Sequence, residues 1–341
     1  MSNMLRRGDY DLLLTLADCR VLTCEQLAVL CGRNVAATRQ RLRDLKAGYL
    51  IKAIARTFNE GPGRPDGLVS LSRAAVDILK EEGLISESTA PEQVTAERLP
   101  CVEHQLVVNE TRIQLVAMQR AMPEFQVRVF NPVPLHTADG VVASSSTQRG
   151  VFEPRGPGGK DVFVPDGVFV LSHKPAQKTL LFFLEVDMNT QPLNSRSPCK
   201  RDVRRKIGSY QECFRQRGFA RYEDLCGCPL RGFRLLLLTT HAARLSALCR
   251  IVRAMPPSNF IWLTDRPSLL AQGIWAAIWV AGGMDAQPRQ SILGTKAPDP
   301  CPSPTTVLRT RDSTGGGVAG WLSWMFRGKR ECTGQSELQK D

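Results

Sequence analysis

The chain has 341 residues and carries 45 Lys and Arg against 33 Asp and Glu, for a formal net charge of +12. Hydrophobic residues make up 43% of it, enough for the cores of two domains, which excludes a chain without a core. The charge favours a polyanionic partner, nucleic acid first, although Arg-rich proteins from GC-rich genomes can carry such a charge without binding an anion.

The cysteines and the apolar segments exclude two further classes. The eleven cysteines form no framework, and Cys226-x-Cys228 has no second pair or nearby His to complete a zinc site. No signal peptide precedes the charged start, and residues 318–326 are too short to cross a bilayer. We therefore expect reduced thiols, no membrane partner and a cytoplasmic protein.

Residues 1–85 are expected to form the first domain. Apolar periodicity predicts helices over 8–18, 23–31 and 35–50, with Thr23 and Asn34 as N-caps. Two short strands, "IKAIARTF" and "GLVSLS", enclose a tip rich in Gly and Pro, and a helix over 73–83 follows. This order of elements is typical of a winged helix-turn-helix domain.

Basic side chains on the third predicted helix indicate contact with double-stranded DNA. The second helix of a helix-turn-helix enters the major groove, where basic groups meet phosphates and guanine edges. Arg56 and Arg64 at the wing tip are placed to touch the neighbouring backbone. The alternative is a solvated helix face in a dimerisation module. The residues expected to bind DNA, here and in the second domain, are Arg39, Arg41, Arg43, Lys46, Arg64, Arg204 and Arg205.

A polar linker over 86–98 is expected to lead into an α/β domain over 99–285. The predicted order is helix 99–121, strand 125–130, strands "DVFVPDGVFVL" and "TLLFFLEVDM", helix 199–217, strand 233–240, helix 242–254 and strand 260–265. This order predicts an α/β sandwich around a central mixed sheet. We expect a mobile Gly/Ser-rich insert over 137–160 and a disordered tail over 286–341.

Three carboxylates lie where buried strands should carry none. Glu185 and Asp187 share one face of their strand by its period of two, and Asp166 begins the strand before it. Acids that converge repel one another unless a cation neutralises them, and oxygen ligands suit Mg²⁺ or Mn²⁺. In the structural alternative, Glu185 pairs with an Arg and Asp187 caps a turn. Lys206 and Tyr210, four residues apart on the following helix, share a face that we expect to adjoin the acids.

These motifs together carry a family resemblance. A winged helix followed by "PDGVFVL", "FFLEVDMNT" and "KIGSY" resembles the replication-relaxation proteins of plasmids and integrative elements. The same elements resemble the restriction-endonuclease-like core with its PD…(D/E)-x-K signature, although Asp187 stands where that lysine should be and Lys206 is the candidate replacement. The resemblance implies metal-dependent nicking of DNA at an origin. The residues that it assigns to the catalytic site are Asp166, Glu185, Asp187, Lys206 and Tyr210, of which the three acids would hold the metal.

Two functions follow as hypotheses, an Mg²⁺-dependent nickase and a catalytically inactive DNA-binding accessory factor or regulator. A weaker third is a structural partner of other relaxation-complex proteins, or a homodimer joined through the winged helix. His104 and Glu110 on the helix before the sheet are further candidates, as a proton carrier and a metal ligand. Both residue types are more often structural on an amphipathic helix.

Overall fold

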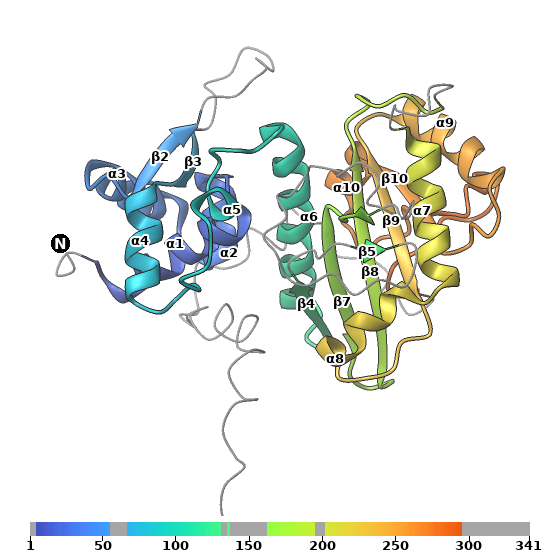
Figure 1. The fold of residues 1–341 in the computed structure, drawn as a ribbon, viewed down its shortest axis with the longest axis horizontal. Helices are drawn as coiled ribbons and strands as arrows, with labels where there is room; N and C mark the ends of the chain where they lie inside the picture. The colour runs from blue at the N-terminus through green and yellow to red at the C-terminus, as the bar shows by residue number, and fades with distance from the viewer. Residues whose placement is uncertain (1–4, 55–66, 131–134, 137–161, 195–201, 295–341) are drawn as a thin grey trace, which may run out of the picture.

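The computed structural model describes residues 5–54, 67–130, 135–136, 162–194 and 202–294. Figure 1 shows a small N-terminal module beside an α/β domain, with the long helix α6 (Val102–Ala121) standing between them. The chain is an α/β protein with a mixed six-stranded sheet. No helix in the described ranges is both long enough and apolar enough to cross a membrane.

The N-terminal module combines four helices with a small antiparallel sheet. Its elements in chain order are α1 (Arg7–Cys19), β1 (Leu22–Thr23), α2 (Cys24–Cys31), α3 (Val35–Ala47), β2 (Ile51–Ile54), β3 (Leu68–Leu71) and α4 (Arg73–Glu81). The predicted caps are confirmed: Thr23 accepts a hydrogen bond from the backbone N–H of Gln26, and Asn34 accepts from those of Ala36 and Ala37. Strand β1, which pairs with β3, was not predicted, because two residues are too few to show a period.

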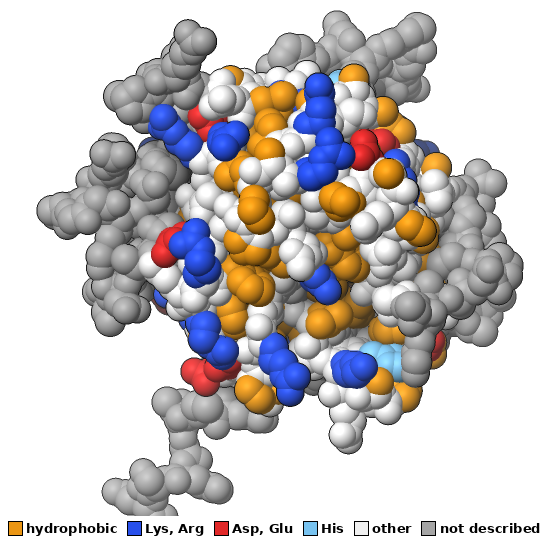
Figure 2. Space-filling view, turned by 90° about the vertical axis from the view of Figure 1, so that its right-hand side faces the viewer, with side chains coloured by type: hydrophobic (Ala, Val, Ile, Leu, Met, Phe, Trp, Pro, Cys, Tyr) orange, Lys and Arg blue, Asp and Glu red, His pale blue; other side chains and the backbone are white. Residues whose placement is uncertain are grey.

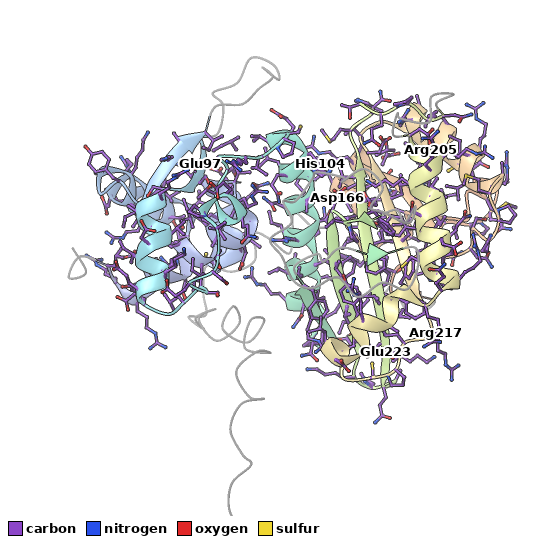
Figure 3. The ribbon with its side chains drawn as sticks, in the orientation of Figure 1. Glu97, His104, Asp166, Arg205, Arg217 and Glu223 are labelled. Carbon is purple, nitrogen blue, oxygen red and sulfur yellow. The ribbon has the colours of Figure 1, made fainter. Side chains whose placement is uncertain are left out.

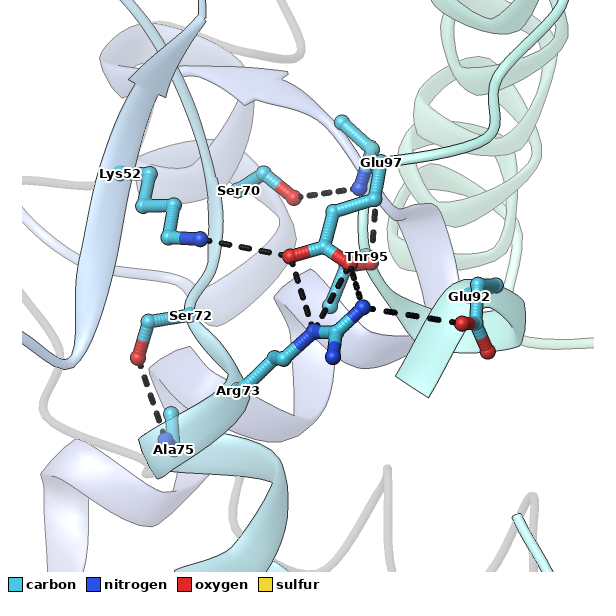
Figure 4. A network of polar contacts seen from close by, with 9 residues as sticks. Lys52, Ser70, Ser72, Arg73, Ala75, Glu92, Thr95 and Glu97 are labelled. Atoms are coloured by element: carbon cyan, nitrogen blue, oxygen red, sulfur yellow. Dashed lines mark hydrogen bonds and ion pairs between the residues drawn. The ribbon is translucent and has the colours of Figure 1, made fainter. Parts of the chain in front are cut away.

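The segment expected as a linker, residues 86–98, packs against this module. It contains a short helix, α5 (Pro91–Val94). Arg20, which is 3% exposed, donates to the backbone oxygens of Glu92 and Thr95. Glu97 forms ion pairs with Lys52 and Arg73, and these contacts join the segment to β2 and α4 (Figure 4). Because its backbone oxygens and Glu97 bind the module, the segment is not a free spacer.

The α/β domain is built on one sheet with the strand order β11-β10-β9-β8-β7-β4. Strands β4, β7 and β8 form an antiparallel meander, β8, β9 and β10 run parallel, and β11 pairs antiparallel at the edge. The strands are β4 (Phe125–Phe130), β7 (Gly167–His173), β8 (Lys178–Asp187), β9 (Phe233–Thr239), β10 (Ile261–Asp265) and β11 (Val280–Ala281). Shorter elements are β5 (Leu135–His136), β6 (Val162–Phe163), a 3₁₀ helix over 218–222 and α8 (Glu223–Cys226).

Helices cover both faces of this sheet. Helices α7 (Val203–Arg215) and α9 (Ala242–Arg253) pack on the face to which Leu181 and Phe183 of β8 point. Helix α6 and the segment that follows α10 (Arg266–Gln272) pack on the opposite face, against Phe182 and Leu184. Because β8 is buried on both faces, its sequence is an apolar run without alternation.

Two expectations for this domain need correction. The segment 161–171, expected as one strand, is broken at Pro165-Asp166, and only its second part, β7, joins the main sheet. The domain also extends past residue 285, because Ile292 is 2% exposed in the core and Ser291 donates to the backbone oxygen of Trp275. The predicted insert over 137–160 and the tail from 295 onward lie outside the described residues.

Helix α6 belongs to both parts of the molecule. Ile113 packs in the core of the N-terminal module, whereas Leu115 and Met118 pack against the sheet. Asn109 has no exposed surface, and its amide donates to the backbone oxygens of Cys19 at 3.0 Å and Val21 at 2.7 Å. Further along α6, Arg112 and Arg120 donate to the backbone oxygens of Asp18 and Val29. These side chains therefore bind α6 to carbonyl oxygens at the end of α1, in the turn after it and in α2.

Replacing Asn109 with Ala is expected to lower the free energy of unfolding by about 1–3 kcal/mol, because the backbone oxygens of Cys19 and Val21 each lose a buried hydrogen bond. Urea unfolding followed by circular dichroism measures the change. Asn194→Ala, at an exposed loop position, is the matched control and should stay within about 0.5 kcal/mol of the wild type. Equal effects of the two substitutions would show that Asn109 does not hold the module to α6.

Candidate functional site

Asp166 lies at the point where β7 separates from β8. Its backbone N–H donates to the oxygen of Leu184 at 3.0 Å, and its Oδ2 accepts from the N–H of Val186 at 2.8 Å. The carboxylate thus takes the place of a backbone acceptor at the end of the ladder. The next residue, Gly167, permits this close approach, since a Cβ there would lie 3.3 Å from the Cβ of Leu184.

Glu185 projects from β8 toward α7. It is 2% exposed, and its Oε1 accepts a hydrogen bond of 2.5 Å from the hydroxyl of Tyr210. Its Oε2 forms an ion pair with the ammonium of Lys206. Lys206 and Tyr210 lie one turn apart on α7, so the helical period brings both to the same carboxylate, as the sequence predicted.

His104 joins the site from the opposite face of the sheet. It lies in the first turn of α6, and its Nε2 is 3.1 Å from Oδ2 of Asp166 (Figure 3). The sequence offered His104 only as a secondary candidate, since one His on a helix carries no spacing signal. The site therefore combines side chains from α6, the start of β7, β8 and α7.

Charge coupling separates the pKa values of the two carboxyl groups. Burial by itself would raise the pKa of Asp166, but the positive charges of Lys206 and His104 outweigh it, and that pKa lies below its ordinary value. Burial raises the pKa of Glu185 to about 8, and the nearby Asp166 adds to the effect while Lys206 opposes it. Burial disfavours the charge of Lys206, yet Glu185 and Asp166 together raise its pKa. The site thus favours a charged Asp166 and Lys206 at neutral pH.

Asp187, expected as a third metal ligand, is engaged elsewhere. It does share a face of β8 with Glu185, but its carboxylate accepts from Arg244 of α9 at 2.6 and 3.2 Å. Both side chains are about one tenth exposed. Glu110 is likewise paired with Arg266, at 2.8 and 2.5 Å. The structural alternative is confirmed for Asp187 as a turn cap, because its Oδ1 also accepts from the N–H of Asn189 at 3.3 Å. The expected Arg partner of Glu185 was wrong, since Lys206 takes that place.

Two of the three predicted metal ligands, Asp166 and Glu185, still lie together. Among the described residues, no group of three or more His, Cys, Asp or Glu is arranged to hold a metal ion. Asp166 and Glu185 do place two interacting carboxyl groups together, and Lys206 is the cation that holds Oε2 of Glu185. Carboxylate oxygens suit Mg²⁺ or Mn²⁺, which commonly keep several waters and only one or two carboxylates. The pair fits such an ion, whereas the predicted trio does not.

The basic residues of α3 divide into bound and available ones. Arg41, expected to bind DNA, makes two hydrogen bonds of 2.6 Å to Asp9 of α1 and is 21% exposed, so it holds two helices together. Arg39 is 58% exposed and pairs with Glu25, while Arg43 and Lys46 are exposed. Arg64 lies outside the described residues.

Arg204 and Arg205 are exposed in the first turn of α7, near the site, and Arg205 also lies 3.8 Å from Asp202. Figure 3 shows Arg205 at one end of α7 and Arg217 near the other. The end of the α/β domain far from the N-terminal module carries many Lys and Arg side chains and few acids (Figure 2). This distribution fits a surface that meets phosphate groups.

Comparisons with known proteins place the chain in one family. A family model described as replication-relaxation matches residues 13–226, a span that includes most of the N-terminal module and the whole cluster around Asp166. A search of curated proteins gave no match. A solved structure titled "Crystal structure of RV1404 from Mycobacterium tuberculosis" matches 35% of this chain and 74% of its own, with 21% sequence identity. Its TM-score of 0.21 is too low to support an argument.

The ion pair of Asp9 predicts a pH dependence of stability. Burial alone would raise the pKa of Asp9, but hydrogen bonds from Arg41 and from the N–H of Arg6 place it below the ordinary 3.8. A carboxylate with a lowered folded pKa stabilises the protein above its unfolded pKa and loses that effect as pH falls through the folded value. Asp9→Asn should therefore lower the free energy of unfolding by about 2 kcal/mol at pH 7, and the difference should shrink below about pH 4.

Urea unfolding of both proteins at pH 7 and pH 3 measures this difference. Asp77→Asn, on the exposed face of α4, is the control and should change little at either pH. An Asp9→Asn effect of the same size at both pH values would contradict the assignment to the charged pair.

Proposed function

The chain belongs to the replication-relaxation family, which links it to the replication and relaxation of DNA, and from this premise we propose that it is a metal-dependent DNA nickase. In this proposal the N-terminal module is a winged helix that finds the site, and the α/β domain cuts one strand. The observation that carries the proposal is the convergence of Asp166, Glu185 and Lys206 where β7 and β8 separate.

The order of helices and strands in the α/β domain supports a restriction-endonuclease-like core. The first element is helix α6. Three antiparallel strands (β4, β7 and β8), a second helix (α7) and a parallel strand (β9) follow it in that order. The PD dipeptide precedes the second of these strands, and the glutamate lies in the third. The lysine comes from α7 in place of β8, where Asp187 occupies its expected position.

Each residue of the site has a separate task in this proposal. Asp166 and Glu185 would hold Mg²⁺ or Mn²⁺, which when bound activates water and neutralises charge that grows on a phosphate in transit. Lys206 supplies positive charge next to Glu185 and is placed to hold a phosphate oxygen. Tyr210 fixes Glu185 through Oε1 and, being fully buried behind it, is a positioning residue and not a nucleophile. His104 orients Asp166 and can carry a proton at Nε2.

The N-terminal module supports DNA binding by its order of elements. Helices α2 and α3 are joined by a short turn, and the antiparallel strands β2 and β3 follow directly, as in a winged helix. Arg39, Arg43 and Lys46 remain exposed on α3 after Arg41 is assigned to Asp9. The partner in this proposal is double-stranded DNA, and the context is an origin on a plasmid or another mobile element.

A second candidate function is a DNA-binding accessory factor without catalysis. The observation that favours it is the pairing of Asp187 with Arg244, together with the pairing of Glu185 with Lys206, because each uses a cation of the protein where a metal would otherwise be needed. In that case the acids keep the sheet edge closed and α7 in place, and DNA binding is the whole activity.

Purified protein is expected to convert supercoiled plasmid that carries its own flanking DNA into open circles when Mg²⁺ is present. Asp166→Asn and Glu185→Gln should lower the rate by about 100-fold or more, because each loses a carboxylate that would hold the metal ion against the charge developing on the phosphate. Agarose electrophoresis over time measures the rates. Asp224→Asn, at an exposed position on α8, should nick as the wild type does.

The same samples separate the two candidates. Both site variants must keep the circular dichroism spectrum of the wild type for the comparison to count. Wild-type protein that binds the DNA but leaves it supercoiled with Mg²⁺ and with Mn²⁺ would refute the nickase and leave the accessory factor.

DNA binding itself is expected to depend steeply on salt, because contacts to phosphates release counterions. Lys46→Ala should weaken binding by a similar factor on every sequence and reduce the slope of log affinity against log salt by about one. Fluorescence anisotropy with labelled duplexes at several salt concentrations measures both effects. Asp166→Asn should bind as tightly as the wild type, and a large loss in that variant would show that the α/β site, not α3, provides the affinity.

A further inference from the structure

The exposed side chains of α3 form a stripe that contains no bulky apolar group. Ala36, Gln40, Arg43 and Ala47 are all exposed, and they recur at spacings of four, three and four residues. A helix with 3.6 residues per turn places such positions in one line along its surface. The opposite side of α3 carries Leu42 and Leu45, which are 7% and 2% exposed and anchor the helix in the core of the module.

Apart from Arg43, the charged residues of α3 lie beside this stripe. Arg39 and Lys46 follow the helical period along one flank, where they are placed to meet a phosphate backbone. Asp44 lies along the other flank, and its charge is shared with Arg41, whose Nη1 is 3.2 Å away. Two small alanines at the ends of the stripe allow the helix to approach a partner closely.

Gln40 is held in a defined orientation. Its Nε2 donates to Oδ1 of Asp44 at 3.2 Å, and because the residue is exposed, its second amide hydrogen and its Oε1 are left for a partner. Arg43 lies one turn further along the same line. An amide that offers one donor and one acceptor matches adenine N7 and N6, and a guanidinium matches guanine N7 and O6.

We propose that Gln40 and Arg43 read bases in the major groove. The target of this protein then contains an adenine and a guanine that are either neighbours or separated by one other base pair. The spacing follows from the 5–6 Å that separate neighbouring side chains one turn apart on a helix, against a rise of about 3.4 Å per base pair. The inference rests on the proposed DNA-binding function and adds to it which residues carry specificity. Arg39 and Lys46 then supply affinity that does not depend on sequence.

Selection from a pool of random double-stranded DNA tests this assignment without any need for nicking. The wild type should enrich a motif that contains the adenine and the guanine. Gln40→Ala should lose the preference at the adenine, and Arg43→Ala that at the guanine, each by about tenfold or more in relative affinity. Gln40→Glu should shift the preference at its position toward cytosine, whose amino group donates to a carboxylate.

Two controls keep a structural effect apart from base reading. Arg250→Ala removes an exposed arginine of α9 and should enrich the same motif as the wild type. Replacement of the motif guanine by 7-deazaguanine removes only N7 and should weaken the wild type about tenfold while leaving Arg43→Ala unchanged.

The outcomes distinguish this inference from the function on which it rests. A wild type that binds DNA but enriches no motif, or variants that enrich the wild-type motif, would overturn the assignment of Gln40 and Arg43 and leave DNA binding intact. A wild type that binds none of the pool would overturn the proposed function and the inference together.

Discussion

The burial of two carboxyl groups beside one lysine is the constraint on which the α/β domain depends. Glu185 is buried and Asp166 is partly buried, and Lys206, Tyr210 and His104 bind them, because an unpaired buried charge would cost several kcal/mol. This requirement fixes α7 over one face of β8 and the start of α6 near the other. Asp166 directly precedes β7, and this position brings its carboxylate to the end of the β7–β8 ladder.

Helix α6 extends this constraint to the N-terminal module. Its first turn carries His104 at the site, and its middle carries Asn109 and Arg112, which bind carbonyls at the end of α1. One rigid helix therefore fixes the position of the module relative to the carboxylates. If α3 binds DNA, the distance from the bound sequence to the site is set by α6 and not by a flexible linker, because residues 92–97 are themselves bound to the module.

Local patterns in the sequence predicted the elements and part of the site. Thr23 and Asn34 marked helix starts because capping needs only a side chain and the next turn. The placement of Lys206 and Tyr210 on one face of α7 was predicted in the same way, from their spacing of four residues. The sequence did not predict that Arg244 takes Asp187 or that Asp9 takes Arg41, since these partners are 57 and 32 residues apart. Ion pairs between distant elements leave no periodic signal.

The sequence by itself determined the order of helices and strands, the basic character of α3 and the unusual carboxylates of β8, because each follows from composition or from a period along the chain. Only the tertiary structure decided which of those charged groups are neutralised within the protein. That decision depends on which elements pack side by side. It brought Asp166, Glu185 and Lys206 together, while it paired Asp187 with Arg244 and Arg41 with Asp9. Packing sets the partners of a charge, and the partners determine whether it is available to a ligand.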